Sequence, residues 1–584
     1  IRLIYFLFLL VIVARLSYWQ IWKSEDLVAL AEGQRVSSSE VAAPRGDILF
    51  SDGSVLVSNK VSFQMFAQPK VIADKLGTAK KLASILSEVQ YGQEWKEQRE
   101  KITEIEQLRT FDLEKEQKIK LIEEELMKNF SKDLFWVSLG WRVDNDTRLE
   151  IDKLRIDGIG FDQKLVRFYP ESSSAAHLVG FIGADAYGVD KGYFGLEGYY
   201  NGELRGKKGL ITQERDAHGL PILLGNYDFK DPSTGKTLML TVDRTIQTVV
   251  EEKLKKGIEK YGAKGASAIV MDPYSGGILA MASYPNYDPG KIGDFPKEYF
   301  RNPVTVDGYE PGSTFKVLVM AAAINEGLVT PDTICTICDK PVEMSGFTIR
   351  TWNNKYTPNS TMTDVIVHSD NTGMVFIAEK LGIQKMYEYI SNFGFGRLTG
   401  VDLEDEYSPD LRELDTWKPI DLATSSFGQG ISVTALQVVR AVATIANGGH
   451  LMEPRVVSVI KSQNGITKIE PREIGKPITP QTAALVKDMM VEAVDTGEAK
   501  FAKPKGYRIA GKTGTAQIAV GGTYDAKNTI ASFVGFAPAD DPKFVMLVRY
   551  DQPTSSIYGA ETAGPTFFDI AREIFTYYGI PPTN

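Results

Sequence analysis

Residues 309–316 read Tyr-Glu-Pro-Gly-Ser-Thr-Phe-Lys, and the apolar run Val-Leu-Val-Met-Ala-Ala-Ala follows over residues 317–323. The Pro-Gly pair predicts a turn, and the apolar run predicts a buried helix. Ser313 and Lys316, three residues apart, would share one face of a helix. A serine hydroxyl becomes a nucleophile when a neighbouring base accepts its proton. A lysine in a dry site beside another cation can have its pKa lowered enough to be that base. The stretch therefore predicts a serine nucleophile with a lysine base.

Two further stretches make this short pattern specific. Residues 369–371 read Ser-Asp-Asn, and residues 512–514 read Lys-Thr-Gly. The ordered set S-x-x-K, S-D-N and K-T-G is the signature of penicillin-binding proteins and class A β-lactamases. The sequence therefore resembles the serine acyl-transferases that recognise D-Ala-D-Ala.

The resemblance implies a role for each residue of the first two motifs. Ser313 would attack the carbonyl of the penultimate D-Ala and form an acyl-enzyme, and Lys316 would take its proton. Ser369 would relay a proton to the leaving amine, because a hydroxyl can both donate and accept. Asn371 would hold the substrate backbone and Lys316. We expect no catalytic role for Asp370.

The third motif is expected to bind the substrate. Lys512 would attract the substrate carboxylate, with Thr513 and Thr515 hydrogen-bonding it. Gly514 would let the substrate approach a strand edge closely. The backbone N–H groups of Ser313 and Thr515 would form an oxyanion hole.

Other chemistry-bearing residues fit less well. His368 precedes Ser369, but no Asp or Glu spacing supports a triad, so we expect it to be structural. Cys335 and Cys338 form C-x-x-C without the second pair that zinc usually needs, and without the context of a redox motif. They are interpreted as a local disulfide or as two free thiols. No metal and no cofactor are expected.

The start of the chain predicts a membrane anchor. Residues 3–22 are mostly apolar, with an interruption at Arg15, and a stretch of about 20 such residues is long enough to span a bilayer. Tyr18, Trp19 and Trp22 would lie in the interfacial belt. A cleaved signal peptide is the alternative, because residues 29–31 read Ala-Leu-Ala. That site lies far from the apolar core, so we favour an uncleaved anchor over residues 1–22. No second long apolar run follows, which predicts a single-pass protein.

The segment after the anchor resembles the non-catalytic module of class B penicillin-binding proteins. Residues 41–53 match its A-x-R-G-x-I-x-D-x-x-G opening, with a small departure at the Asp of the pattern. Residues 167–180 and 195–206 resemble its R-x-Y-P…H-x-x-G and G-x-E-x-x-Y…L-x-G segments. We expect a pedestal domain, of the dimerisation type, over residues 23–235.

Two patterns predict the architecture of the rest. From about residue 82 to 133 the chain is charged, with apolar residues at helical spacing, which predicts a helical hairpin inserted in the pedestal. Residues 236–584 would form the transpeptidase domain. Its strands come from both ends, with a helix-rich segment between them. This order predicts an α+β fold, an antiparallel sheet with helices on both sides.

The whole chain resembles a class B, monofunctional D,D-transpeptidase that cross-links peptidoglycan stem peptides. Nothing in it resembles a glycosyltransferase domain, and no repeat module is expected after the last motif. The flanks of the motifs, including residues 394–396 and 426–430, are similar to the septal, division-specific branch. The alternatives are the elongation branch, a β-lactam sensor, or a β-lactamase, for which Glu413 gives only a faint match.

The resemblance and the charge together set the expected partners. A net charge of −9 argues against nucleic acid. The resemblance implies stem peptides, β-lactam antibiotics, and a membrane-embedded glycosyltransferase of the shape, elongation, division and sporulation (SEDS) type. It also implies a bacterial cytoplasmic-membrane protein with an extracytoplasmic catalytic domain.

Overall fold

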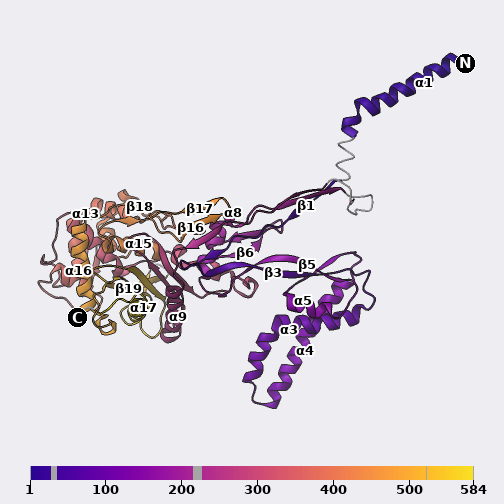
Figure 1. Ribbon diagram of the computed structural model, residues 1–584. Coiled ribbons are helices and arrows are strands. Elements are labelled where there is room, and N and C mark those ends of the chain that lie inside the picture. The colour runs from indigo at the N-terminus through magenta and orange to yellow at the C-terminus, as the bar shows by residue number, and fades with distance from the viewer. Residues whose placement is uncertain (1, 28–35, 215–221, 223–226, 521–522, 583–584) are drawn as a thin grey trace. The chain divides into compact units, whose positions relative to one another are not determined.

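The computed structural model describes most of the chain (Figure 1). The described residues are 2–27, 36–214, 222, 227–520 and 523–582. The chain forms two compact units. One comprises Ile1–Val57 together with Tyr169–Asn584, and the other comprises Ser58–Phe168.

A five-stranded antiparallel sheet is the centre of the first unit. Two neighbouring strands come from an earlier part of the sequence, and the other three come from near its end. The α+β fold predicted from the sequence has this arrangement. That prediction is confirmed. In spatial order the strands are β12 (Ile278–Tyr284), β11 (Gly265–Met271), β21 (Phe544–Asp551), β20 (Thr523–Ala537) and β19 (Ala510–Val520).

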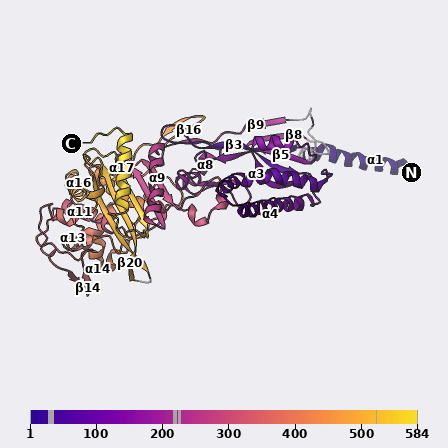
Figure 2. The same ribbon diagram turned by 90° about the horizontal axis from the view of Figure 1, so that it is seen from below.

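Side chains alternate between the two faces of this sheet, because successive residues of a strand point to opposite sides. On β11, Ala268 and Val270 pack in one core cluster with α9 (Arg244–Tyr261) and α17 (Ala563–Tyr577). Ile269 belongs to a second cluster, which α11 (Lys316–Asn325) and α15 (Ala435–Ala446) complete on the opposite face. Figure 2 shows β20 with α17 and α9 on one side and α11 on the other. The sheet is therefore a two-sided core.

Further elements of this unit surround the sheet. The helices and short helical turns are η2 (Ile292–Asp294), η3 (Lys297–Phe300), α10 (Pro303–Val306), η4 (Gly312–Phe315), α11 (Lys316–Asn325), α12 (Met362–Val367), α13 (Asn371–Asn392), η5 (Leu414–Thr416), α14 (Pro419–Ser426), α15 (Ala435–Ala446), α16 (Pro480–Asp495) and η6 (Lys500–Ala502). The small strand pairs are β13 (Val342–Met344) with β14 (Phe347–Ile349), and β15 (Leu451–Met452) with β18 (Glu473–Gly475).

The pedestal part of this unit is mostly β-structure. A buried ion pair holds two of its sequence motifs together: Arg45 contacts the carboxylate of Glu197 at 2.6 Å. The elements are β1 (Val36–Val41), β2 (Ile48–Leu49), α6 (Ala176–Val179), β6 (Phe181–Ala184), β7 (Asp190–Tyr193), α7 (Gly195–Tyr199), α8 (Asn201–Leu204), β8 (Gly209–Glu214), β9 (Tyr227–Lys230), β10 (Thr237–Leu240), β16 (Val457–Ser462) and β17 (Gly465–Lys468). β1, β8 and β9 form one sheet, and β17, β16, β10 and β2 follow one another in a second.

The second unit combines a small sheet with a helical hairpin. β3 (Val55–Ala67) pairs antiparallel with β4 (Val137–Val143) and with β5 (Ile159–Phe168). The long helices α3 (Lys75–Lys101) and α4 (Ile105–Phe130) lie where the sequence predicted the hairpin, and α5 (Asn145–Asp152) follows β4. Two ion pairs join the long helices, Lys115–Glu88 and Lys118–Glu94.

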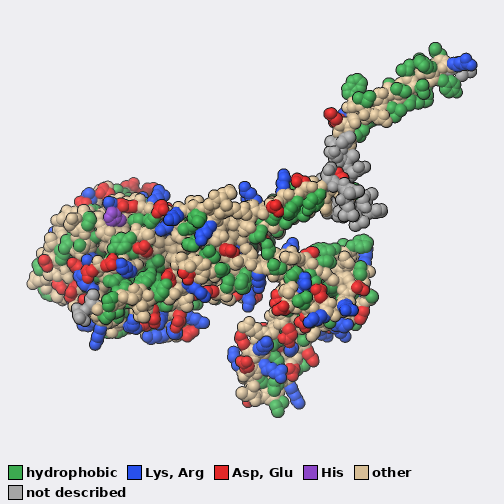
Figure 3. Space-filling model, in the orientation of Figure 1, with side chains coloured by type: hydrophobic (Ala, Val, Ile, Leu, Met, Phe, Trp, Pro, Cys, Tyr) green, Lys and Arg blue, Asp and Glu red, His purple; other side chains and the backbone are tan. Residues whose placement is uncertain are grey.

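The N-terminal helix carries its apolar side chains on the outside. α1 (Arg2–Ser17) continues into the π-helical turn η1 (Tyr18–Trp22), and neither contains a buried residue. Together they are long and apolar enough to cross a membrane. Figure 3 shows hydrophobic side chains along this helix. The Ala-Leu-Ala site at residues 29–31 lies outside the described residues.

Candidate active site

Ser313 lies in η4, a 3₁₀ turn directly before α11, and not in the α-helix itself. Gly312 has a φ of +57°, which a glycine adopts without strain. Its N–H donates to the carbonyl of Gly428 at 3.0 Å, and a Cβ on Gly428 would lie 2.2 Å from the Gly312 oxygen. Two glycines thus let the turn and a neighbouring loop pack closely. Ser313 is partly exposed although the rest of η4 is buried, so a solvent-accessible serine sits on a tightly held turn.

Lys316 is fully buried at the first residue of α11. Its Nζ donates to the carbonyl of Ser369 at 2.6 Å and to Asn371 Oδ1 at 2.7 Å, and it lies 3.3 Å from Ser369 Oγ. Burial, and then the positive charge of Lys512, hold the pKa of Lys316 well below its usual value, against the opposing effect of acidic neighbours. The site therefore favours an uncharged amine at this position.

Ser369 lies in the tight connection between α12 and α13. Its φ of +55° places it in the left-handed region, which non-glycine residues seldom adopt. The next residue, Asp370, caps α13 by accepting the N–H of Thr372 at 2.7 Å. The carboxylate of Asp370 therefore serves the helix start, and the connection it fixes holds Ser369 against Lys316.

Asn371 is oriented by two partners. Its Oδ1 accepts from Lys316, and its Nδ2 donates to the carbonyl of Arg350 at 2.9 Å. A carbonyl can only accept, so the Arg350 carbonyl requires the NH₂ end of the amide and leaves Oδ1 to face Lys316.

Lys512 lies on β19 and is almost fully buried, with its Nζ 3.2 Å from Thr513 Oγ1. Burial lowers the pKa of Lys512 to about 8, against the opposing effect of Glu498. At neutral pH most of this side chain therefore keeps its positive charge. Thr513 in turn lies 3.5 Å from the carboxylate of Glu498.

Gly514 and Thr515 lie further along β19, the last strand of the sheet. A Cβ on Gly514 would lie 2.8 Å from Thr314 Cγ2 and 3.3 Å from the Pro311 oxygen, so the strand can pass directly beneath the turn that carries Ser313. Thr515 Oγ1 accepts the N–H of Gly559 at 3.1 Å. The structure thus brings the nucleophile turn and the third motif together.

The hydrogen bonding within the site differs from the simplest expectation in one respect. Between the described residues Ser313 and Lys316 there is no hydrogen bond, and Lys316 is held by Ser369 and Asn371 instead. Catalytic hydrogen bonds are often long without substrate and tighten in the reacting complex. The site thus combines three features. Buried Lys316, whose surroundings favour the uncharged amine, lies close in sequence to the accessible Ser313. Lys512, whose surroundings leave most of its positive charge at neutral pH, lies on the edge strand of the sheet.

Comparison with known proteins agrees with this geometry. The family "Penicillin binding protein transpeptidase domain" matches residues 266–575, and "Penicillin-binding Protein dimerisation domain" matches residues 40–240. The chain is 32% identical over 587 residues to "Stage V sporulation protein D" of Bacillus subtilis, covering 98% of this chain and 84% of that protein. The chain belongs to the class B penicillin-binding proteins.

Two further proteins are similar to this chain over nearly its whole length. The "Probable peptidoglycan D,D-transpeptidase PenA" of Neisseria meningitidis is 29% identical, covering 98% of this chain and 91% of that protein. The crystal structure of penicillin-binding protein 2X from Streptococcus thermophilus has a TM-score of 0.72 at 24% identity, covering 93% of this chain and 80% of that one. This class B penicillin-binding protein therefore shares the fold of a solved relative, and its catalytic region is a transpeptidase domain.

Two aromatic residues beside the site, Trp352 and Tyr558, belong to none of the three motifs and were not predicted from the sequence. A cavity of about 350 Å³ is lined in part by Trp352, His368, Asp370 and Glu498. Trp352 donates to the carbonyl of His368 at 3.3 Å, and its ring packs edge-on against Tyr558 at 5.5 Å. Trp352 and Tyr558 are far apart in sequence, and no local pattern marks either of them, so only the fold reveals the pair.

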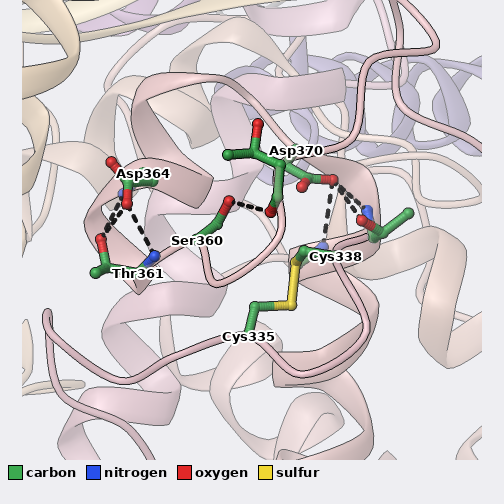
Figure 4. The surroundings of a disulfide bond; sticks show 9 residues. Cys335, Cys338, Ser360, Thr361, Asp364 and Asp370 are labelled. Atoms are coloured by element: carbon green, nitrogen blue, oxygen red, sulfur yellow. Dashed lines mark hydrogen bonds between the residues drawn. A yellow bond between two sulfur atoms is a disulfide. The ribbon is translucent and has the colours of Figure 1, made fainter. Parts of the chain in front are cut away.

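The two cysteines form a disulfide, which decides between the two alternatives left open by the sequence (Figure 4). The N–H of Cys335 donates to the carbonyl of Ser360 at 2.8 Å, just before α12. The side chain of His368 is exposed, and its carbonyl is the group that Trp352 contacts. Among the described residues no group of three His, Cys, Asp or Glu side chains is placed to hold a metal.

Proposed function

We propose that this protein is a peptidoglycan D,D-transpeptidase that works through an acyl-enzyme on Ser313. The hydrogen bonds of Lys316 carry the proposal. The Ser369 carbonyl and Asn371 Oδ1 can only accept, so they use both hydrogens of a neutral amine. The lone pair of Lys316 is then left to take a proton from a hydroxyl. A lysine held in this way suits a general base.

The reaction follows from these positions. Ser313 Oγ attacks the carbonyl carbon of the penultimate D-Ala, and its proton passes to Lys316. As the peptide C–N bond breaks, the terminal D-Ala leaves with a proton relayed through Ser369, which lies 3.3 Å from Lys316. The amine of a second stem peptide then attacks the ester carbonyl and loses a proton. The ester C–O bond breaks, Ser313 Oγ takes up that proton, and the new amide bond completes the cross-link.

The third motif supplies the binding surface for the donor peptide. β19 is the terminal strand of the sheet, so its free edge suits an extended peptide. The charge of Lys512 attracts the terminal carboxylate, and Thr513 and Thr515 offer hydroxyls to it. Gly514 leaves room for close approach. Backbone N–H groups of Ser313 and Thr515 would stabilise the oxyanion, where a single donor is worth roughly 10²–10³ in rate.

The same chemistry predicts acylation by β-lactam antibiotics, in keeping with the family to which the chain belongs. Fluorescent penicillin should label the wild type, and mass spectrometry should locate the adduct on Ser313. Ser313→Ala should not be labelled, and a strongly labelled Ser313→Ala protein would reject the assignment. Glu413, the faint β-lactamase match, is exposed and lies before η5. We therefore expect the penicilloyl-enzyme to persist for many minutes, whereas rapid release would favour a β-lactamase.

We propose the domain limits 1–22, 23–235 and 236–584 for anchor, pedestal and transpeptidase domain. The anchor would cross the bacterial cytoplasmic membrane once and leave the rest extracytoplasmic. Because nothing in the given sequence resembles a glycosyltransferase domain, we propose that the protein binds a SEDS-type glycosyltransferase through the anchor and the pedestal. Lipid is as apolar as the helix, so this packing depends on side-chain fit. Replacing residues 3–22 by an unrelated spanning helix should preserve penicillin binding and abolish co-purification.

The proposed place of action is the division septum, on the basis of the motif flanks. The similarity to a protein named for stage V of sporulation makes a role in spore formation the second candidate. Depletion that yields filaments with blocked division would support the septal role. Normal division with defective spores would support the second candidate, and rounded cells that still divide would point to elongation.

A further inference from the structure

A row of cross-strand partners lies beneath the turn that carries Ser313. Gly514 of β19 is opposite Ser532 of β20, and Ser532 is opposite Arg549 of β21. Directly paired residues of neighbouring strands have their side chains on the same face. Val545 and Leu547, which alternate in step with Arg549 along β21, pack in the same core cluster as α11. The row therefore faces the nucleophile helix.

Residues 309–314, which lead into this turn and form most of it, lie across the row and pack against it at two places. The guanidinium of Arg549 lies over the ring of Tyr309, 4.5 Å from its centroid. Two strands away, a Cβ on Gly514 would meet the oxygen of Pro311 and the methyl group of Thr314 at the short distances given above, so the chain before and within the turn packs close to this glycine. Tyr309 precedes Ser313 by four residues, so Arg549 supports the start of the turn and Gly514 supports its middle.

Arg549 is itself held firmly. It is 5% exposed, and its Nε donates to Asp551 Oδ1 at 2.6 Å. A guanidinium is planar and stacks on an aromatic face, which a lysine ammonium cannot do in the same way. The S-x-x-K, S-D-N and K-T-G motifs do not include this buried cation, and the chemistry derived above gives it no part.

The position of Tyr309 depends on its ring and its backbone. Its N–H and carbonyl each form a 2.9 Å hydrogen bond with Val433, but its buried hydroxyl has no hydrogen-bond partner among the described residues. The hydroxyl therefore does not fix the ring. The face of the ring that meets Arg549 sets how closely the turn lies on the sheet.

We propose that Arg549 is a positioning residue of the acylation step, which acts through Tyr309 on the placement of Ser313. The inference rests on the proposed acyl-enzyme function and adds a residue to it. Small displacements of a reacting group cost up to roughly 10²-fold in rate. Removing the support should therefore slow bond formation while the non-covalent binding of the antibiotic stays the same.

The test is a kinetic study of full-length Arg549→Met and Arg549→Lys with a reporter penicillin. Both variants should show an acylation rate constant about 10- to 100-fold lower, with an unchanged dissociation constant for the complex that precedes acylation. Arg549→Lys keeps a charge beside Asp551 and decides the matter if Arg549→Met does not fold. Wild-type acylation constants in the variants that fold would overturn the inference.

Two controls separate positioning from general loss of stability. Tyr309→Phe keeps the ring and should react like the wild type. Arg440 is another buried arginine, which donates to the carbonyls of Gly394 and Thr399. Arg440→Met should lower the melting temperature without slowing acylation. An equal kinetic loss in Arg440→Met, or a large loss in Tyr309→Phe, would contradict the proposed route.

A double-mutant cycle tests whether Arg549 acts through Tyr309. The combination of Tyr309→Leu with Arg549→Met should lose no more than the worse single variant, because both remove the same contact. If the double variant instead shows the product of the two single losses in acylation rate, the inference is overturned. Failure of penicillin to label Ser313 in the wild type would reject the proposed function and the inference with it, whereas wild-type labelling with unaffected Arg549 variants rejects the inference alone.

Discussion

Lys316 Nζ and Asn371 Oδ1 are joined by a hydrogen bond of 2.7 Å, although 55 residues separate them in the sequence. The other end of the Asn371 amide is bound to the carbonyl of Arg350. The amide thus presents a neutral acceptor to the lysine and cannot turn around without placing its oxygen against the carbonyl oxygen of Arg350. This neutrality matters because a negative acceptor would favour the charged, non-basic form of Lys316.

Asn371→Asp tests this relationship. A carboxylate beside Lys316 would raise its pKa, and an opposite charge at such distances shifts a pKa by about 1–3 units. Acylation requires the neutral amine, so the acidic limb of the pH–rate profile should move to higher pH by that amount. Asn371→Ala is the control, because it removes the same bond without adding a charge. An acidic limb at the same pH in the wild type and Asn371→Asp would contradict the assigned role of Lys316.

The two active-site lysines should respond differently to arginine. Lys316→Arg should lose nearly all acylation, since a guanidinium does not deprotonate in proteins and cannot act as the base. Lys512→Arg should retain most of it, because there the substrate carboxylate requires only a positive charge. The measurement is the acylation rate constant with fluorescent penicillin. Equal damage from the two substitutions would show that the lysines do not have separate roles.

The pH profile of the wild type follows from the same two groups. Acylation should rise with pH as Lys316, whose pKa is held well below the usual lysine value, loses its proton. It should fall again as Lys512, with a pKa of about 8, becomes neutral and no longer attracts the carboxylate. The profile of the second-order acylation constant is therefore expected to be bell-shaped. Lys512→Arg should remove the basic limb, and a limb that stays near pH 8 in that variant would assign it to another group.

The sequence predicted the parts of the site that recur as short motifs. Ser313, Lys316 and Asn371 could be proposed as site residues because their chemistry depends on residue type and order, and the structure places Lys316 in contact with Asn371. It did not predict that Ser313 would precede the α-helix in a 3₁₀ turn, because the glycine contacts that shape this turn come from a loop more than a hundred residues away. Arg549 was missed because its position depends on strand register, and Glu498 because it lies in the connection between α16 and η6, which only the fold brings to Thr513.

The exact ends of helices were also difficult to predict from the sequence. The helical hairpin was expected from about residue 82, where the apolar spacing becomes regular. In the structure α3 begins at Lys75, because Asp74 caps it by accepting the N–H of Gly77 at 2.9 Å. Two strands of the central sheet were easier to predict, since β11 and β21 contain the apolar runs 268–271 and 544–548, which are buried on both faces.

The pedestal offers a prediction about stability that is separate from the chemistry. Arg45 and Glu197 belong to two sequence motifs more than 150 residues apart, and the structure joins them as a buried pair. Arg45 also donates to Asn201 at 3.0 Å, and the Glu197 side chain is 0% exposed. Glu197→Ala removes the carboxylate that the partly buried guanidinium of Arg45 contacts. Breaking a fully buried pair costs about 3–5 kcal/mol, so we expect a loss of stability at or below this range.

Glu197→Ala should therefore lower the melting temperature clearly while the acylation constant of the folded protein stays unchanged, because neither residue touches the serine site. The double variant Arg45→Met with Glu197→Leu is the informative control. Replacing both charges by apolar groups leaves no uncompensated charge in the interior, so the double variant should be more stable than Glu197→Ala. A double variant less stable than Glu197→Ala would mean that the guanidinium stabilises the pedestal mainly through its other contacts.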